Sequence, residues 1–230
     1  MTQKIKVGII GGAGYTGGEL VRILLNHPNA EIAYVHSKSS AGKPLHSVHT
    51  DLIGETEVQF TGEITAPSEV GGADVVFLCV GHGEAKGFVS ENSTILQGKV
   101  IDLSQDFRDE SDGFVYGLPE LNKERIRNAQ YIANPGCFAT AIQLALLPLA
   151  QKGLLANEVH ISAITGSTGA GQKLTDTVHF TWRNNNISVY KAFAHQHLKE
   201  IRRSLTQLQS DFSQKIHFIP YRGNFTRGIL

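Results

Sequence analysis

The stretch Val7-Gly8-Ile9-Ile10-Gly11-Gly12-Ala13-Gly14-Tyr15-Thr16-Gly17 decides the fold of this chain. It runs from an apolar strand through a glycine-rich turn into a helix, and it fits the spacing Gly-x-Gly-x-x-Gly; a Gly-x-x-Gly-x-x-Gly spacing from Gly11 also fits. In that context, backbone N–H groups at the helix start meet the pyrophosphate of a dinucleotide. We therefore expect a cofactor site rather than an ordinary glycine-rich turn, made by Gly11, Gly12, Ala13, Gly14, Tyr15, Thr16 and Gly17.

Short apolar runs alternate with helical patterns through the first 150 residues of the chain. This alternation is typical of a parallel sheet with crossover helices, and it predicts an α/β, Rossmann-type nucleotide-binding domain. A helix is expected over 15–26, and a second, short helix is expected to be capped near Asn122. Strands are expected over residues 7–10, 32–36, 75–80, 100–103 and 131–133.

The pattern of apolar, glycine-rich and polar segments changes after Gly153. This change indicates a second, α+β domain that carries the catalytic residues. The predicted domain boundaries are 1–136 and 137–230. Within the second domain we expect a helix over 196–208, strands over 159–164 and 216–219, a glycine loop over 166–171 and a polar segment over 182–186. Because the chain ends on an apolar Ile-Leu pair, we expect this domain to be incomplete at its C-terminus.

The charge of the chain is balanced, with 21 Lys and Arg against 21 Asp and Glu in 230 residues. A broad basic surface for nucleic acid or for an anionic membrane is therefore not expected. The first residues lead directly into a strand without the apolar core of a signal peptide, and the apolar stretch 137–150 is too short to span a bilayer. Two cysteines make no disulfide framework. We expect a soluble, cytoplasmic protein with small-molecule partners.

The end of the second predicted strand indicates which cofactor is bound. Enzymes that use NAD usually have an acidic residue there, about 20 residues beyond the glycines, which holds the ribose 2′-hydroxyl. This chain reads His36-Ser37-Lys38 instead, and a hydroxyl with a cation suits a 2′-phosphate. Ser37 and Lys38 therefore favour NADP, with a solvated polar loop as the alternative.

One cysteine lies where a short strand passes into a long apolar helix, in the run Asn134-Pro135-Gly136-Cys137. Pro135 and Gly136 supply the bend, and Gly136 is expected to leave room for a substrate beside the backbone. A helix start stabilises the thiolate, which predicts that Cys137 is a nucleophile. The alternative is a buried structural cysteine, which is what we expect of Cys79 in its apolar strand.

These motifs resemble those of the N-acetyl-gamma-glutamyl-phosphate reductase family of arginine biosynthesis, which is similar in plan to aspartate-semialdehyde dehydrogenase. The resemblance covers essentially the whole chain. It is carried by six ordered segments: Gly14-Tyr15-Thr16-Gly17-Gly18-Glu19-Leu20, Asp102-Leu103-Ser104-Gln105-Asp106-Phe107-Arg108, Tyr116-Gly117-Leu118-Pro119-Glu120-Leu121, Asn134-Pro135-Gly136-Cys137, Thr165-Gly166-Ser167-Thr168-Gly169-Ala170-Gly171 and His195-Gln196-His197-Leu198-Lys199-Glu200-Ile201.

The resemblance implies NADP-dependent reduction of N-acetyl-L-glutamyl 5-phosphate to the 5-semialdehyde, with release of phosphate, through a thioester on Cys137. It implies that His197 is the acid or base and that His195 and Glu200 lie near the substrate. The spacing also favours His197, because on a helix only His197 shares a face with Glu200. The alternative is a pair of ordinary polar residues at a helix start.

The resemblance further implies that Arg108 is a ligand of phosphate or carboxylate, with a surface salt bridge to Asp106 or Asp109 as the alternative. No metal site is expected, because His197 and Glu200 lack a companion cluster of ligands. The remaining histidines are interpreted as structural or solvated: His36, His46, His49, His82, His160, His179 and His217.

Two other functions stay open from the sequence. A related semialdehyde dehydrogenase would act on another acyl phosphate, such as aspartyl phosphate, and a non-catalytic protein would sense NADP without turnover. Members of the family have longer chains than this one. We also expect a homo-oligomer. The chain also departs from the family, whose members typically read Pro-His-Leu-Val-Pro-Met before an Arg-Gly pair. This chain reads Pro220-Tyr221-Arg222-Gly223-Asn224-Phe225-Thr226-Arg227-Gly228 instead, so the resemblance does not extend to the acyl-group pocket.

Overall fold

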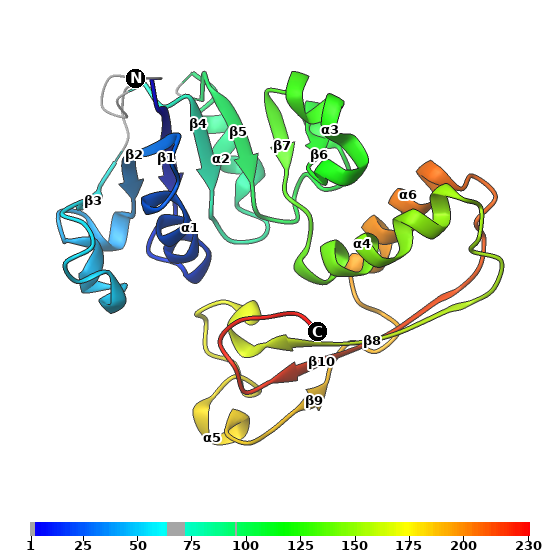
Figure 1. The fold of residues 1–230 in the computed structure, drawn as a ribbon. Helices are drawn as coiled ribbons and strands as arrows, with labels where there is room; N and C mark the ends of the chain where they lie inside the picture. The colour runs from blue at the N-terminus through cyan, green and yellow to red at the C-terminus, as the bar shows by residue number, and fades with distance from the viewer. Residues whose placement is uncertain (1–2, 64–71, 95) are drawn as a thin grey trace. The chain divides into compact units, whose positions relative to one another are not determined.

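The computed structural model describes residues 3–63, 72–94 and 96–230, and the chain divides into two compact units (Figure 1). The first unit consists of Met1–Gly117 and Glu124–Asn134. The second unit consists of Leu118–Lys123 and Pro135–Leu230. No helix in the described ranges is long and apolar enough to cross a membrane.

A seven-stranded sheet forms the centre of the first unit, in the order β3-β2-β1-β4-β5-β7-β6. Every neighbouring pair is parallel, which confirms the predicted Rossmann-type arrangement. The strands are β1 (Ile5–Ile10), β2 (Ala30–His36), β3 (Phe60–Thr61), β4 (Val75–Leu78), β5 (Lys99–Asp102), β6 (Val115–Tyr116) and β7 (Tyr131–Ala133). The helices are α1 (Tyr15–Leu25), α2 (Ala85–Glu91) and α3 (Pro119–Asn128), of which α3 runs across the division between the units.

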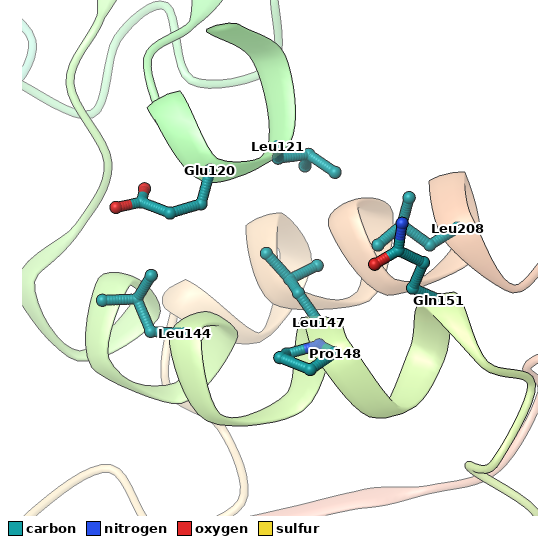
Figure 2. A pocket seen from close by; sticks show the side chains of 7 residues that line it. All are labelled: Glu120, Leu121, Leu144, Leu147, Pro148, Gln151 and Leu208. Carbon is teal, nitrogen blue, oxygen red and sulfur yellow. The ribbon is translucent and has the colours of Figure 1, made fainter.

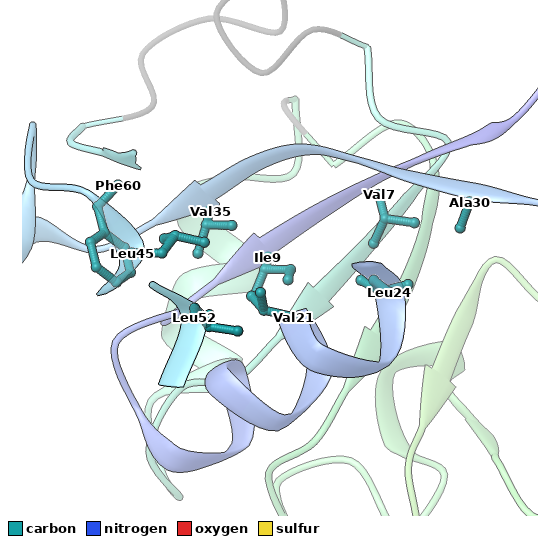
Figure 3. Packing of buried hydrophobic residues seen from close by; sticks show 9 residues of the cluster. All are labelled: Val7, Ile9, Val21, Leu24, Ala30, Val35, Leu45, Leu52 and Phe60. Atoms are coloured by element: carbon teal, nitrogen blue, oxygen red, sulfur yellow. The ribbon is translucent and has the colours of Figure 1, made fainter. Parts of the chain in front are cut away.

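The sheet is apolar on both faces, as parallel sheets are when helices cover them. Val7 and Ile9 of β1 pack with Val21 and Leu24 of α1 in one buried cluster (Figure 3). Ile10 belongs to a second cluster, which contains residues of β4 and β5 and packs against α2. Each fully buried side chain of this size contributes about 1.5–3 kcal/mol through removal from water. The glycine turn after β1 is thus held between two cores.

The second unit combines two long helices with a small mixed sheet, in agreement with the α+β prediction. The helices α4 and α6 lie side by side. Strand β10 pairs in parallel with β8 and antiparallel with β9. The elements are α4 (Cys137–Gln151), β8 (Val159–Gly166), α5 (Phe180–Arg183), β9 (Ser188–Val189), α6 (His197–Leu208) and β10 (Ile216–Gly223).

Several elements differ from the sequence prediction. Helix α3 begins three residues before Asn122, which has non-helical torsion angles (φ −125°, ψ 26°) inside it. Asn122 thus lies inside the helix instead of at its start, and its Oδ1 accepts a hydrogen bond from Nε2 of Gln207 at 3.1 Å. The expected glycine loop contains a 3-10 turn (Ser167–Ala170), and the expected polar segment overlaps α5. Four other 3-10 turns, and the two-residue strands β3, β6 and β9, were not predicted; the turns are Lys38–Ser40, Leu45–Ser47, Thr50–Leu52 and Ser111–Gly113.

Candidate functional site

The glycine turn after β1 is shaped by backbone hydrogen bonds and close packing. Gly11 has a positive φ of +82°, a conformation that residues with a side chain adopt only with strain. The N–H groups of Gly11 and Gly12 both donate to the carbonyl of His36, at 3.1 and 2.9 Å. A Cβ on Gly12 would lie 2.1 Å from Cγ1 of Val35, so only glycine fits there. His49, interpreted from the sequence as structural or solvated, holds the turn by donating from Nε2 to the Gly12 carbonyl at 2.8 Å.

Gly14 differs from the other glycines of the turn because the protein leaves open space beside it. It precedes α1 in an extended conformation (φ −76°, ψ 166°), and the nearest atom to an added Cβ is the Gly11 carbonyl oxygen at 3.5 Å. The first N–H groups of a helix have no partner within that helix, and they bind anions readily. This open helix start fits the pyrophosphate of a dinucleotide.

Ser37 and Lys38 lie at the carboxyl end of β2, where ligands bind in parallel sheets. Ser37 is buried, its N–H donates to the Thr61 carbonyl at 2.9 Å, and its Oγ lies 3.3 Å from Oγ of Ser39. Lys38 is exposed, and it makes no hydrogen bond or ion pair among the residues described. Burial, followed by the Lys38 charge, lowers the pKa of His36, so its imidazole is neutral at pH 7. The pair therefore fits a phosphate ligand.

Arg108 ties together the ends of two central strands. Its Nε donates to the Asn134 carbonyl at 2.9 Å and its Nη2 donates to the Leu103 carbonyl at 3.2 Å. The Asp106 carboxylate accepts two backbone N–H groups at the start of α2. Arg108 thus lies at the carboxyl edge of the sheet, next to the chain segment that leads to Cys137.

Cys137 is the first residue of α4, and its side chain is exposed. The preceding Gly136 is extended (φ −65°, ψ 149°), and its carbonyl accepts from both N and Oγ1 of Thr140, at 2.8 and 3.0 Å. This turn buries Phe138 completely and leaves the thiol outside the core. Cys79 lies one residue beyond β4, and burial raises its pKa to about 12. Exposure and position at a helix start are the features of a reactive cysteine.

The backbone at Gly136 is packed against two residues of α6. A Cβ on Gly136 would lie 2.4 Å from Nε2 of His197 and 2.7 Å from Oε1 of Glu200. The Gly136 N–H donates to Oε2 of Glu200 at 3.0 Å, and Nε2 of His197 lies 3.9 Å from Oε1 of the same carboxylate. The expectation that Gly136 leaves room for a substrate was wrong, because the His197 ring fills that room. Glycine is required so that the histidine can reach the start of the cysteine helix.

His195 is 4% exposed and sits among aromatic rings. Its ring centroid lies 4.5 Å from that of His197, 5.6 Å from Phe138, 5.4 Å from Phe218 and 5.7 Å from Tyr190. Burial, followed by neighbouring positive charges, lowers its pKa to about 4. It is therefore neutral at pH 7, and because its Nδ1 accepts the His197 backbone N–H at 3.3 Å, its proton is on Nε2.

The spacing argument for the two histidines needs a correction. Helix α6 begins at His197, so His195 is not on the helix, and its ring packs against that of His197 instead of pointing to another face. The distinction between the two residues comes from their environment. A neutral ring with a pKa of about 4 serves as a hydrogen-bond donor near neutral pH, whereas His197 has a carboxylate beside it.

The sequence analysis gave no role to Tyr190 and Arg222, yet both lie against this cluster. The guanidinium carbon of Arg222 is 4.2 Å from the centroid of the Tyr190 ring, and that ring contacts His195. The only sequence signal for Arg222 was its place in the segment that departs from the family pattern. Tyr190 follows a two-residue strand and carries no periodic signal.

A cavity of about 260 Å³ lies elsewhere in the second unit (Figure 2). It is formed where α3, α4 and α6 meet, and five of its seven lining residues are apolar: Glu120, Leu121, Leu144, Leu147, Pro148, Gln151 and Leu208. These α4 residues start two turns beyond Cys137, so the cavity does not contain the reactive thiol.

Three potential metal ligands also meet on the small sheet, namely Glu158, His160 and His217, with ligand atoms within 4.8 Å of one another. The two imidazole rings stack, with centroids 4.6 Å apart and planes at 12°, so their nitrogens do not converge on one point. Nε2 of His217 is 3.0 Å from Oε2 of Glu158. The observed arrangement is a histidine–carboxylate hydrogen bond beside a stacked ring.

Both units of the chain match known protein families and resemble solved structures. Residues 6–129 match the model "Semialdehyde dehydrogenase, NAD binding domain", and residues 137–230 match "Semialdehyde dehydrogenase, dimerisation domain". The fold resembles aspartate semialdehyde dehydrogenase with NADP from Candida albicans, with a TM-score of 0.74 at 18% identity over 99% of this chain and 70% of that one. It also resembles aspartate semialdehyde dehydrogenase II from Vibrio cholerae, with a TM-score of 0.67 at 18% identity over 96% and 71%.

Curated relatives are much more similar in sequence. The N-acetyl-gamma-glutamyl-phosphate reductase of Christiangramia forsetii is 59% identical over 98% of this chain and 69% of its own length. Those of Azobacteroides pseudotrichonymphae and Flavobacterium johnsoniae are 60% and 58% identical over 98% of this chain, and over 69% and 70% of their own lengths. The resemblance predicted from the sequence motifs is thus confirmed. The chain belongs to the N-acetyl-gamma-glutamyl-phosphate reductase family, among the semialdehyde dehydrogenases.

Proposed function

We propose that this chain carries out the NADP-dependent reduction of N-acetyl-L-glutamyl 5-phosphate to N-acetyl-L-glutamate 5-semialdehyde, with release of phosphate, as in arginine biosynthesis. The observation that carries the proposal is the contact between the start of the Cys137 helix and the His197–Glu200 pair. The name of its close relatives supports the substrate. We assign cofactor binding to residues 1–136 and chemistry to residues 137–230.

The cysteine thiolate makes the covalent intermediate. Its Sγ bonds to the acyl carbon, and the bond from that carbon to the phosphate oxygen breaks, so that phosphate leaves with the electron pair and a thioester remains on Cys137. The oxyanion that forms in the attack is stabilised by backbone N–H groups at the start of α4. When bound, NADPH supplies the hydride that reduces the thioester carbonyl.

His197 handles the proton of the second half of the reaction. It donates a proton to the oxygen of the thiohemiacetal on Cys137, and it takes that proton back as the carbon–sulfur bond breaks, which releases the aldehyde and returns the Cys137 thiolate. The Glu200 carboxylate, 3.9 Å from Nε2 of His197, stabilises the charged imidazolium. His195 stays neutral and donates from Nε2, which suits a hydrogen bond to a substrate oxygen. Arg108 is assigned to a phosphate or carboxylate of the substrate.

The cofactor is assigned to the first unit. The space beside Gly14 would accept the pyrophosphate, with further contacts from Gly11, Gly12, Ala13, Tyr15, Thr16 and Gly17. Ser37 and Lys38 would hold the 2′-phosphate, because a hydroxyl and an exposed cation lie together at the end of β2. The match of residues 6–129 to an NAD-binding domain and the NADP bound to a structural relative support this assignment.

The decisive experiment is oxidation of NADPH with N-acetyl-L-glutamyl 5-phosphate, or the phosphate-dependent reverse reaction with the semialdehyde. Turnover should fall by ~10³-fold or more in Cys137→Ser, because a hydroxyl is a far weaker nucleophile than a thiolate, while NADPH affinity stays unchanged. Cys79→Ser is the matched control. A Cys137→Ser enzyme that keeps more than about a tenth of the activity would falsify the thioester route.

Two further readouts separate the alternatives. Aspartyl phosphate, tested in parallel, identifies a relative with another substrate, and NADPH binding without any turnover identifies a sensor. Iodoacetamide should label Cys137 well before Cys79, whose thiol has its pKa raised to about 12 by burial. Because residues 137–230 match a dimerisation domain, we also propose a homo-oligomer, to be measured by light scattering.

A further inference from the structure

Arg222 lies at the end of a continuous chain of contacts that begins at the nucleophile. The His197 ring fills the space beside Gly136, its neighbour ring His195 is 4.5 Å away, and Tyr190 is 5.7 Å beyond His195. The Arg222 guanidinium packs on the face of Tyr190 at 4.2 Å. Every one of these residues belongs to the second unit, so the arrangement does not depend on how the two units are placed.

The guanidinium of Arg222 contacts Tyr190 but is not fully hydrogen-bonded. Its Nε is buried and has no hydrogen-bond acceptor, and no carboxylate of the described residues forms an ion pair with it. Buried polar atoms are nearly always satisfied in native proteins, so an orphan of this kind needs an explanation. Nε and the adjacent Nη together form one edge of the planar fork that binds two oxygens of a carboxylate or phosphate.

A second arginine fixes the position of the first. Arg183 is 3% exposed, and its guanidinium donates hydrogen bonds to neighbouring groups of the protein. Its Nη1 donates to the Arg222 carbonyl at 2.6 Å, and its Nη2 donates to the Thr177 carbonyl at 2.7 Å and to Oγ of Ser188 at 3.1 Å. Ser188 on β9 is also the register partner of Arg222 on β10. Arg183 is thus a clamp on the backbone of Arg222, and it adds positive charge to the region.

We propose that Arg222 binds an oxyanion of the substrate, a carboxylate or the phosphate, while the acyl carbon is at Cys137. This proposal rests on the proposed function for the identity of the substrate. The substrate carries both kinds of oxyanion, and Glu200, the acidic residue of the cluster, has one oxygen occupied by the Gly136 N–H. The Arg222 guanidinium, with its unpartnered Nε and in the neighbourhood of His195, provides an anion subsite that would orient the substrate relative to the thiol.

Protection of Cys137 from iodoacetamide tests this without turnover. The rate of alkylation is measured against increasing concentrations of inorganic phosphate and, separately, of N-acetyl-L-glutamate, for the wild type and for Arg222→Gln. The concentration that gives half protection should rise at least tenfold for one or both ligands in the variant. A rise for N-acetyl-L-glutamate alone identifies the carboxylate, and a rise for phosphate alone identifies the phosphate. Arg222→Lys keeps the charge and should fall between the two.

The matched control is Arg202→Gln, because Arg202 also packs on an aromatic ring, with its guanidinium 5.8 Å from the Phe212 centroid. That variant should keep wild-type protection. The proposal fails if Arg222→Gln is protected like the wild type, or if neither ligand protects the wild type. It also fails if the variant alters the alkylation rate without ligand or lowers the melting temperature, because Arg222 would then only support Tyr190. Wild-type turnover is scored separately, so a protein that shows Arg222-dependent protection without turnover contradicts the proposed function alone.

Discussion

Each unit of this protein contains a helix that is preceded by a glycine and follows a strand after a short turn, and the surroundings of the two helix starts differ. Gly14 before α1 and Gly136 before α4 have similar extended torsion angles, with ψ values of 166° and 149°, and neither start has a side-chain cap. Beside Gly14 the nearest atom to an added Cβ is 3.5 Å away. Beside Gly136 the nearest atom is Nε2 of His197, at 2.4 Å.

The difference shows that the same backbone feature, a helix start preceded by glycine, can have two different surroundings. A helix start offers unpaired N–H groups and a partial positive charge. At α1 the protein leaves that start open, which suits an external anion. At α4 the protein places its own carboxylate and imidazole beside Gly136, and the thiol of Cys137 belongs to the first residue of the helix.

Removing the imidazole at the filled helix start should have the largest effect. His197→Asn is expected to lower kcat by about 10²- to 10⁴-fold, because the acid or base is lost, and to flatten the pH profile near neutrality. NADPH affinity should stay constant, since α1 is untouched. His195→Asn is the control and should raise KM for the substrate more than it lowers kcat. The opposite pattern would exchange the roles of the two histidines.

A methyl group added to each helix start tests the comparison directly. Gly136→Ala should lower kcat by about 10²-fold, because the new Cβ displaces His197 from its position. Gly14→Ala should leave both folding and the alkylation rate of Cys137 unchanged, since nothing in the protein lies closer than 3.5 Å, and it should weaken NADPH binding. Thermal melts, alkylation rates and NADPH titrations separate the two. Wild-type NADPH affinity in Gly14→Ala would show that the open start is not the cofactor site.

Reversing the charge of Lys38 at the end of β2 tests the assignment of NADP to the first unit. A partly exposed lysine with a neighbouring hydroxyl contributes about 1 to 3 kcal/mol to binding of a 2′-phosphate, which corresponds to a preference for NADPH over NADH of about 5- to 150-fold. Lys38→Glu should abolish this preference. Lys43→Glu, five residues along the chain, is the control for charge alone. Unchanged discrimination in Lys38→Glu would place the 2′-phosphate elsewhere.

The smallest effect concerns acid stability. The pKa of His195 is about 4 in the folded protein and about 6.5 in an unfolded chain, so between these values the unfolded chain binds a proton that the folded one does not. The free energy of unfolding therefore falls as the pH drops through this window, by at most about 1.4 kcal/mol per pH unit from this group. His195→Gln should make that decline shallower between pH 6.5 and 4.5, and the exposed His179→Gln should not. Denaturant melts across this range decide it, and parallel declines in all three proteins would contradict the pKa shift.

The architecture of the first unit was predictable because its signals are local. The apolar strands and the glycine turn after Ile10 specify a parallel sheet with crossover helices, and the structure has them within one to three residues. Short elements such as β3 and β6 were missed because a two-residue strand has no period of its own. The start of α3 was missed because Asn122 resembles a cap in sequence, whereas in the fold it bonds to Gln207, far along the chain.

The candidate catalytic residues were found through the resemblance, but the reason for their arrangement was not. That Gly136 makes space for His197, and that Glu200 holds the Gly136 N–H, are contacts between residues more than sixty positions apart. No spacing rule reports such contacts. Tyr190 and Arg222 escaped notice for the same reason, since only tertiary packing brings an isolated aromatic residue and an isolated cation together beside His195.

The environments of the two cysteines have a consequence for oxidative damage. The feature on which the proposed role of Cys137 rests, an exposed thiol at a helix start, also makes it the site where peroxide would form a sulfenic acid. A second cysteine can rescue such an acid by forming a disulfide, but only as a thiolate, and Cys79 with a pKa of about 12 stays protonated at physiological pH. These 230 residues contain no other thiol. Recovery of an oxidised Cys137 therefore depends on a thiol from outside these 230 residues, and the reducing capacity of its surroundings sets how long the Cys137 thiol stays reduced.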